Sequence, residues 1–372
     1  MLRKKTHFEQ HTASPHNGET TSRWNRMKKE ALTLEKISEL HSAAYRAENK
    51  SDRTVSWHQL CLASFTSWLQ ETAACAPIVQ EFTLEHVRQW AANLREQPRY
   101  ANHPHMPEHV RSDTLSPETV SWYVRGLRAI STWMYEEGYT SDNVLKRLKA
   151  PKVPDKEIDI LSNQEIEDIL RLFHIHTEIG SRDLAIFTTL LDTGIRAGEL
   201  CDLRLQDLHL DQGYMIVMGK GRKERPVKVG HRTIKAIRFY MAHWRQPARP
   251  TIQNVFLTIG HQMGAIEELW CGSGEPLTVN ALQRILRRVG KRSNVTRLHP
   301  HLLRHTFACM YLMQYHDPFA LKNLLGHTSL TMTYRYVRTV ERLMVIQGTG
   351  ASILDSMELP PMKNHTPNKK KR

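Results

Sequence analysis

The sequence predicts a mainly helical protein of two domains, with a small β-sheet or hairpin in the second domain. Three observations predict it. Helical periodicity recurs along most of the chain, a Pro- and Lys-rich connector interrupts it near residue 150, and two β-rich runs flank residues 219–225. A chain of 372 residues is long enough for each domain to bury a core of its own.

The composition indicates a globular protein with a polyanionic partner. The 52 Lys and Arg against 38 Asp and Glu give a formal net charge of +14, which does not choose among DNA, RNA and an anionic membrane surface. The N-terminus lacks the apolar core of a signal peptide, and no run of about 18 apolar residues occurs, so we expect a cytoplasmic protein with no membrane partner. The five scattered cysteines predict reduced thiols rather than disulfides or a zinc site.

The first 150 residues read as helices. Residues 1–50 form a basic N-terminal extension, and their stretch 24–50 has the apolar spacing of an amphipathic helix, whose basic start is either a DNA contact or a solvated helix end. Residues 51–150 form a helical domain, with helix starts at Ser51 and Ser116. The loop between its later helices contains His103, His105 and His109, but paired ligands are lacking elsewhere, so no metal site is predicted.

The second half begins after a linker at residues 151–160. Helices are expected over most of residues 161–346, with a hairpin in YMIVMGKGRKERPVKV, and residues 347–372 form a C-terminal segment with a basic tail. One helix, in NALQRILRRVGKRSN, places aliphatic side chains on one side and basic ones on the other. The basic side could contact phosphates, or it could simply be a solvated helix face. Its residues are Arg284, Arg287, Arg288 and Lys291.

Four separate segments carry chemistry-bearing residues. LLDTGIRAGEL contains Gly194 and Arg196, GKGRKERPVKV contains Lys220, HPHLLRHTF contains His301 and Arg304, and LGHTSLTMTYRYV contains His327 with two tyrosines. Each segment is unremarkable alone. Residues two apart on a helix point about 200° apart, so only one of Tyr334 and Tyr336 can face a given site.

Together and in this order, the segments resemble the tyrosine recombinases, the phage integrase family of site-specific DNA recombinases, over roughly residues 51–346. The resemblance implies a catalytic set of Arg, Lys, His-x-x-Arg, His and Tyr, with Tyr336 as the nucleophile nine residues after His327 and a packing role for Tyr334. The implied catalytic residues are Arg196, Lys220, His301, Arg304, His327 and Tyr336.

Phosphoryl transfer explains these residue types. Two guanidiniums, of Arg196 and Arg304, can clamp the non-bridging oxygens of a pentacoordinate phosphate, and the imidazoles can hydrogen-bond those oxygens or accept the tyrosine proton. Lys220 is the proposed acid for the 5′ oxygen. The cations neutralise the charge, so no metal and no cofactor is expected. We interpret the nearby Arg222, Lys223 and Arg225 as phosphate contacts or solvated charges. Glu199 is expected to take part in a local hydrogen-bond network. His299 and His305 are expected to orient or pack against other residues.

The resemblance also implies partners and a role. The helical core-binding (SAM-like) domain and the catalytic domain would clamp double-stranded DNA at specific recombination sites, as a dimer on one site and a tetramer in the synapse, exchanging strands through a 3′-phosphotyrosyl link and a Holliday junction. An accessory DNA-bending or directionality factor and a nucleoid location fit this role. Residues 1–50, 98–114 and 261–276 favour the integrase or transposase of a mobile element; an Xer-like chromosome dimer resolvase and a catalytically inactive DNA-binding regulator are the alternatives.

Overall fold

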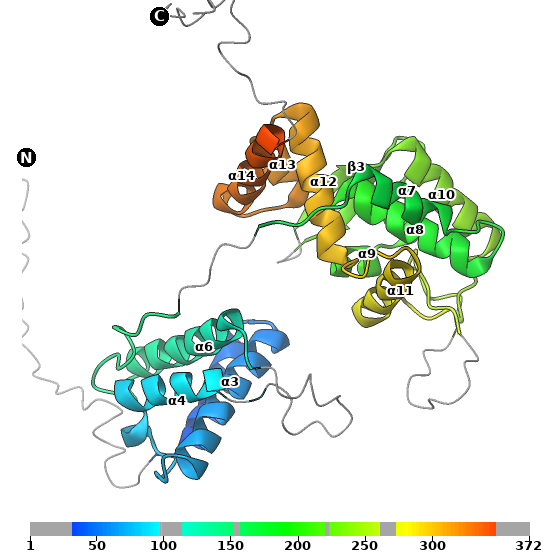
Figure 1. Ribbon diagram of the computed structural model, residues 1–372. Coiled ribbons are helices and arrows are strands. Elements are labelled where there is room, and N and C mark those ends of the chain that lie inside the picture. Colours follow the sequence, from blue (N-terminus) through cyan, green and yellow to red (C-terminus); the bar gives the residue numbers. More distant parts are fainter. Residues whose placement is uncertain are drawn as a thin grey trace, which may run out of the picture. The chain divides into compact units, whose positions relative to one another are not determined.

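The computed structural model describes residues 32–96, 98, 114–151, 157–219, 223–260 and 273–346 (Figure 1). The chain divides into two compact units, Met1–Asp155 and Lys156–Arg372, and each is described by itself. Several sequence-based expectations fall on residues outside the described ranges. They concern the start of the N-terminal extension, the three loop histidines, Lys220, Arg222, Cys271, most of the 261–276 insertion and the C-terminal segment.

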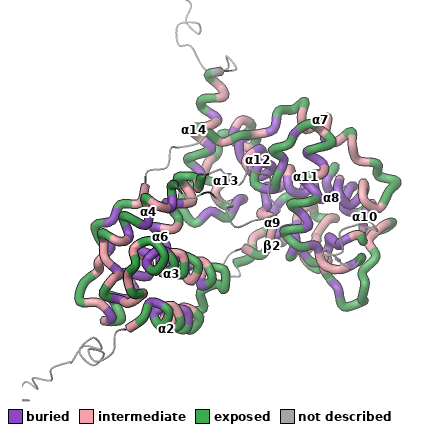
Figure 2. The backbone as a smooth tube through the Cα atoms, turned by 60° about the horizontal axis from the view of Figure 1, so that its bottom comes forward, coloured by how far each residue is buried: buried purple, intermediate pink, exposed green. Residues whose placement is uncertain are grey.

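The first unit is helical. It consists of α2 (Leu34–Ala47), α3 (Asp52–Glu71), the short η1 (Val79–Glu81), α4 (Leu84–Glu96) and α6 (Pro117–Glu136). The hydroxyls of Thr33, Ser51 and Ser116 accept hydrogen bonds from backbone N–H groups in the first turns of their helices, as N-caps do. Buried and exposed positions alternate along each helix with the period of a helix that has one apolar face (Figure 2).

Helix α2 is part of this core. Leu34 and Ile37 are fully buried and belong to the same apolar cluster as Phe65, Trp90 and Leu127. The sequence-based reading placed this helix in a separate extension before residue 51. In the structure the folded unit already begins with α2, because its apolar face packs on α3.

The second unit combines helices with a small sheet. Strands β1 (Leu208–His209), β2 (Tyr214–Met218) and β3 (Glu224–Lys228) form an antiparallel sheet in the order β1-β2-β3, and Met215 pairs with Val227. The predicted hairpin is confirmed, whereas the two-residue β1 was too short to be seen in the sequence. The helices are α7 (Asn163–Arg171), α8 (Glu178–Thr193), α9 (Ala197–Asp202), α10 (His231–His243), α11 (Val279–Arg292), α12 (Pro300–Tyr315), α13 (Pro318–Leu325) and α14 (Leu330–Ile346), with a short η2 (Leu205–Asp207).

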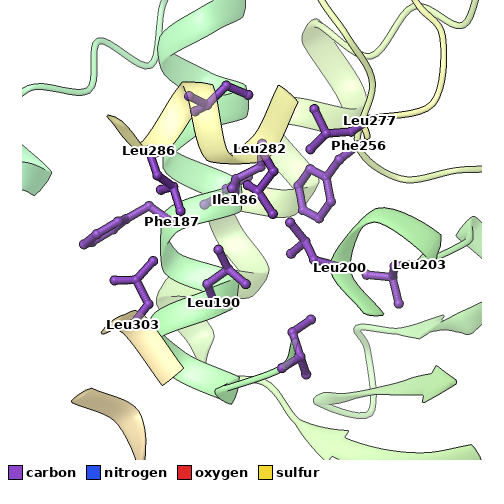
Figure 3. Close-up of a cluster of buried hydrophobic side chains, with 14 of the residues drawn as sticks. Ile186, Phe187, Leu190, Leu200, Leu203, Phe256, Leu277, Leu282, Leu286 and Leu303 are labelled. Atoms are coloured by element: carbon purple, nitrogen blue, oxygen red, sulfur yellow. The ribbon is translucent and has the colours of Figure 1, made fainter. Parts of the chain in front are cut away.

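Helix α8 lies at the centre of the second unit. Its Ile186, Phe187 and Leu190 are fully buried and pack with Leu286 of α11 and Leu303 of α12 (Figure 3). A smaller apolar cluster joins α12, α13 and α14. Helix α12 therefore has one end in each cluster, which holds its middle turns in place between α8 and α14.

Two further expectations can be compared with the described residues. Cys61, Cys75, Cys201 and Cys309 are free thiols, as predicted. Within the described ranges, no helix combines the length and the apolar character needed to cross a bilayer.

Candidate active site

The loop after α8 supplies the first part of the site. Gly194 ends the helix with φ of 61°, and a Cβ added there would lie 2.2 Å from the ring of Phe307. A glycine is therefore required for both its backbone conformation and its lack of a side chain. The Gly194 carbonyl accepts a hydrogen bond of 2.6 Å from Nη1 of Arg304, and Arg196 follows at the start of α9.

Arg304 is the buried centre of the site. Its side chain is only 4% exposed, and its Nη2 donates to the Leu325 carbonyl at 2.8 Å and to Nε2 of His327 at 3.1 Å. A guanidinium only donates, so Nε2 of His327 is the acceptor and its hydrogen lies on Nδ1. That Nδ1–H donates to Oγ1 of the fully buried Thr333 at 3.0 Å. The contacts hold the imidazole in one tautomer and orientation.

Three arginines converge on the last carbonyls of α13. Arg225 donates to Leu324, Arg304 to Leu325 and Arg196 to Gly326. Carbonyls at a helix C-terminus lack intrahelical partners and carry the negative end of the helix dipole, which favours cations there. Gly326 ends α13 with φ of 62° and turns the chain toward His327.

Glu199 joins two of these arginines. Its carboxylate accepts from Nη1 of Arg196 at 2.8 Å and from both Nη atoms of Arg225 at 3.0 and 2.8 Å. Burial raises the pKa of Glu199, but hydrogen bonds from Arg225 and from the backbone of Arg196 outweigh burial and leave the pKa at about 2. The expected hydrogen-bond network of Glu199 is confirmed. The reading of Arg225 as a solvated charge is wrong, because its side chain is only 13% exposed and its guanidinium donates to Glu199 and Leu324, whereas a phosphate contact stays a prediction.

The site carries excess positive charge. Burial and then the charge of Arg196 lower the pKa of Arg304 to about 10. Burial and then the nearby arginines lower the pKa of His327 to about 4, so its imidazole is neutral at pH 7. Three guanidiniums face one carboxylate, and an anion bound between Arg196 and Arg304 would relieve their repulsion.

Tyr336 completes this arginine–tyrosine site. Its side chain is 5% exposed, its hydroxyl lies 2.9 Å from Nδ1 of His305, and its ring stacks on His327 at 6.2 Å between centroids. Burial raises the pKa of the phenol, while the charge of Arg304 acts in the opposite direction. Tyr334 points the other way and is 51% exposed, so the packing role expected for it is wrong.

The structure thus brings together Arg196, Arg304, His327 and Tyr336, and His301 lies near enough for burial and then the charges of Arg304 and Arg196 to lower its pKa. His301 is exposed on the first turn of α12, with its ring centroid 6.3 Å from that of His305. Lys220 belongs to the segment between β2 and β3 and lies outside the described residues. His305 was expected only to orient or pack; its position one helical turn after His301 was the available signal that both rings share a face of α12.

Basic side chains gather on two other surfaces. On α11 the aliphatic side chains are buried while Arg284, Arg287 and Lys291 are exposed, as the periodicity predicted, and these three line a surface hollow. Arg288 differs, because it forms an ion pair with the buried Asp183 at 2.5 Å. Lys223 is exposed beside β3.

In the first unit a groove between α4 and α6 was not singled out from the sequence. It is lined by apolar Val124 and Pro151 and by four cations; the spacing of the two arginines on α4, at i and i+7, could have revealed it. The four cations are Arg88, Arg95, Arg147 and Lys149.

One group of potential metal ligands occurs among the described residues. Cys75, Glu81 and His86 bring a thiol, a carboxylate and an imidazole within 4.8 Å of one another, and Glu81 already contacts His86 at 3.4 Å. These are ligand types that zinc accepts. The group belongs to the first unit, whereas the arginine–tyrosine site belongs to the second.

Known proteins are similar to this chain in sequence. Residues 159–342 match the phage integrase family. The tyrosine recombinase XerC of Oceanobacillus iheyensis is 29% identical over 299 residues, covering 79% of this chain and 88% of that protein. The tyrosine recombinase XerD of Listeria innocua serovar 6a is 29% identical over 234 residues, covering 62% of this chain and 75% of that protein.

Solved structures share the fold. XerH bound to its palindromic difH substrate superposes with a TM-score of 0.62 at 18% identity, covering 86% of this chain and 85% of that one. A lambda integrase dimer on a core site superposes with a TM-score of 0.60 at 14% identity, covering 85% and 80%. Through residues 159–342 and these relatives, the chain belongs to the phage integrase family and is a tyrosine site-specific recombinase.

Proposed function

We propose that this recombinase cleaves and rejoins DNA strands with Tyr336 as the nucleophile. The observation that carries the proposal is the buried hydroxyl of Tyr336 beside Arg304, whose guanidinium shares a cationic site with Arg196. A phosphodiester bound there would present its phosphorus to the phenol and its non-bridging oxygens to the two guanidiniums. Because three Arg304 hydrogen bonds use three of its five N–H groups, others remain for the substrate and the tyrosine.

The reaction conserves the energy of the broken bond. The Tyr336 oxygen forms a bond to phosphorus, the bond to the 5′ oxygen breaks, and that oxygen takes a proton from Lys220. A 3′-phosphotyrosyl ester and a free 5′-hydroxyl result. Attack by the 5′-hydroxyl of a second strand reverses these steps without ATP, and two such exchanges pass through a Holliday junction within a tetramer.

Duplex DNA with specific sites is the proposed partner. The net charge of +14, the exposed cations on α11 and the basic groove of the first unit support it, because phosphate contacts supply most of the non-specific affinity for DNA. The XerH and lambda integrase structures with the same fold were solved bound to DNA. A dimer on each site, a DNA-bending or directionality factor and a nucleoid location complete the proposal.

Replacing Tyr336 by Phe tests the nucleophile. The variant should bind DNA like the wild type but form no covalent adduct with a nicked suicide substrate, because only the attacking oxygen is removed. The adduct is measured as a band that resists denaturation in a gel. Tyr334→Phe is the matched control on the exposed side of α14, and it should form the adduct at the wild-type rate.

Two results would contradict the assignment. An adduct formed by Tyr336→Phe, or one lost only in Tyr334→Phe, would place the nucleophile elsewhere. A wild-type protein that binds its site but never forms an adduct would instead favour a DNA-binding regulator.

The biological role has two candidates. We propose the integrase or transposase of a mobile element, because the residues before α2 and residues 98–114 and 261–276 add to a two-domain recombinase. The XerC and XerD relatives at 29% identity equally favour chromosome dimer resolution. Genome-wide mapping of the covalent adducts separates them: one chromosomal locus indicates a resolvase, whereas the ends and insertion targets of an element indicate an integrase.

A further inference from the structure

We infer that His305 is the residue that receives the phenolic proton of Tyr336 during strand cleavage, an inference that rests on the proposed function. His305 lies on α12 and Tyr336 on α14, two helices that pack against each other. Nδ1 of His305 and the hydroxyl of Tyr336 are 2.9 Å apart, within the range for a proton acceptor.

The surroundings of the hydroxyl give this hydrogen bond a direction. The charge of Arg304 acts on the same phenol, and a guanidinium can only donate, so Arg304 offers the hydroxyl hydrogen no acceptor. The hydroxyl hydrogen is then available to Nδ1 of His305. Neutral His305 would carry its own hydrogen on Nε2 and accept at Nδ1, as a general base must.

The two other imidazoles of the site are worse placed for this task. Nε2 of His327 accepts from Arg304 and its Nδ1–H donates to Thr333, so neither nitrogen has a free lone pair. His301 is exposed one turn earlier on α12. Among the described residues, His305 is the imidazole that hydrogen-bonds the Tyr336 hydroxyl.

Bound DNA would make His305 more basic. Without DNA, burial and then the charges of neighbouring groups lower its pKa to about 4. A phosphodiester adds a negative charge beside Arg304, and the transition state adds more, so the imidazolium becomes favourable when it is needed. The groups around the His305–Tyr336 pair are His299 at the N-cap of α12, His301, Arg304 and Cys309 from α12, Arg335 from α14, and His327, whose ring stacks on that of Tyr336.

The proton balance is closed in both directions. During cleavage the proton moves from the Tyr336 oxygen to Nδ1 of His305, the oxygen–phosphorus bond forms, and the 5′ oxygen leaves with a proton from Lys220. During rejoining, imidazolium His305 returns its proton to the departing Tyr336 oxygen while Lys220 accepts the proton of the attacking 5′-hydroxyl.

Replacing His305 by Asn separates proton transfer from hydrogen bonding. The Asn side-chain oxygen can occupy the position of Nδ1 and accept a hydrogen bond, but it cannot take up the proton. The full chain is assayed under single turnover for adduct formation on a suicide substrate. We expect His305→Asn and His305→Ala to cleave about 100-fold more slowly or worse, with affinity for DNA unchanged.

Three further readouts distinguish a base from a structural residue. The cleavage rate of His305→Asn should keep rising with pH where that of the wild type levels off, and added imidazole should restore His305→Ala at least about tenfold. A substrate with sulfur at the 5′ bridging position, whose leaving group needs no proton, should not rescue either variant. His316→Asn is the control, because it makes the same change at the exposed end of α12 in a left-handed conformation that Asn accepts.

The outcomes separate this inference from the proposed function. His305→Asn cleaving within about threefold of the wild-type rate, with the same pH profile, would overturn the role of His305 as proton acceptor. Rescue of both variants by the sulfur substrate would overturn it too, since the defect would then lie at the leaving group. An adduct on a residue other than Tyr336 would overturn the proposed nucleophile, whatever the His305 variants do.

Discussion

Two tyrosines two positions apart on α14 have opposite surroundings. Tyr336 is 5% exposed and contacts His305, whereas Tyr334 is 51% exposed. The angular step of a helix predicted that only one could face the site, and the spacing from His327 predicted which. What the sequence could not reveal is that, among the residues the structure describes, Tyr334 stays half exposed on the other side of this helix.

Other residue-level features depend on contacts between distant segments. Arg225 is 26 residues from Glu199 and 99 from Leu324, so its ion pair and its carbonyl contact have no local signature. The contact of His305 with Tyr336 spans 31 residues in the same way. The motifs therefore predicted which segments form the site, while the division of roles among neighbouring polar residues required the fold.

Thr333→Val tests the support of His327. Valine has nearly the shape of threonine but cannot accept from Nδ1–H of His327, which leaves a buried donor unpaired at a cost of about 1–3 kcal/mol. We expect the free energy of unfolding to fall by an amount in that range, and cleavage to slow about tenfold because the imidazole no longer holds Arg304 in one orientation. Chemical denaturation and the suicide-substrate assay measure the two effects.

Thr331→Val is the matched control for this change. Thr331 is exposed on the first turn of the same helix, so its variant should match the wild type in both assays. A Thr333→Val protein with unchanged cleavage would show that the bond to His327 is dispensable for the reaction.

At the scale of elements, glycine-ended helices build the site. Gly194 and Gly326 end α8 and α13 in the left-handed conformation, and the carbonyls at both ends accept from arginines. Both glycines could be recognised in the sequence, because each interrupts an apolar helical pattern within one of the motifs. The hairpin could also be predicted, because two β-rich runs flank a glycine-containing turn. Strand β1 could not, because it forms by pairing with β2 and its two residues show no periodicity.

Gly326→Ala tests the end of α13. A left-handed alanine costs roughly 1–2 kcal/mol, and the added Cβ would lie 3.2 Å from the Arg225 guanidinium, which Glu199 holds in place. Gly213→Ala is the control, because its φ is 76° but its nearest non-neighbouring atom is 3.9 Å away. Thermal unfolding should show the larger loss for Gly326→Ala, and only this variant should cleave more slowly. Equal losses with normal cleavage would mean that Arg225 moves aside without consequence.

At the scale of the whole molecule, each unit closes around its own apolar core. The composition of the connector predicted a division near residue 150, and the boundary between Asp155 and Lys156 falls within it. The assignment of α2 could not be predicted equally well. An amphipathic pattern predicts that a helix buries one face, but it does not predict which surface covers that face.

A buried histidine pair in the first unit predicts acid sensitivity. His41 and His58 are 1% and 8% exposed, and Nδ1 of His58 lies 3.4 Å from Nε2 of His41. Burial lowers both pKa values, that of His41 to about 4, with the charge of His58 adding to the effect. Unfolded histidine titrates near about 6.5, so below that pH the unfolded chain binds more protons than the folded one. The stabilising contribution is therefore complete above about pH 6.5 and is lost as the pH falls toward 4.

The double variant His41→Phe/His58→Leu should make the stability of the first unit less dependent on pH. We expect the free energy of unfolding of the first unit to drop by on the order of 2 kcal/mol between pH 7 and pH 4.5 in the wild type, and by much less in the double variant. Tryptophan fluorescence follows this unit, because five of the described tryptophans belong to it: Trp57, Trp68, Trp90, Trp122 and Trp133. Phe65→Leu is the control, since it removes core packing without a titrating group and should lower stability equally at both pH values. A double variant as acid-sensitive as the wild type would show that the acid response arises from other groups, and that the histidine pair opens to water before it is protonated.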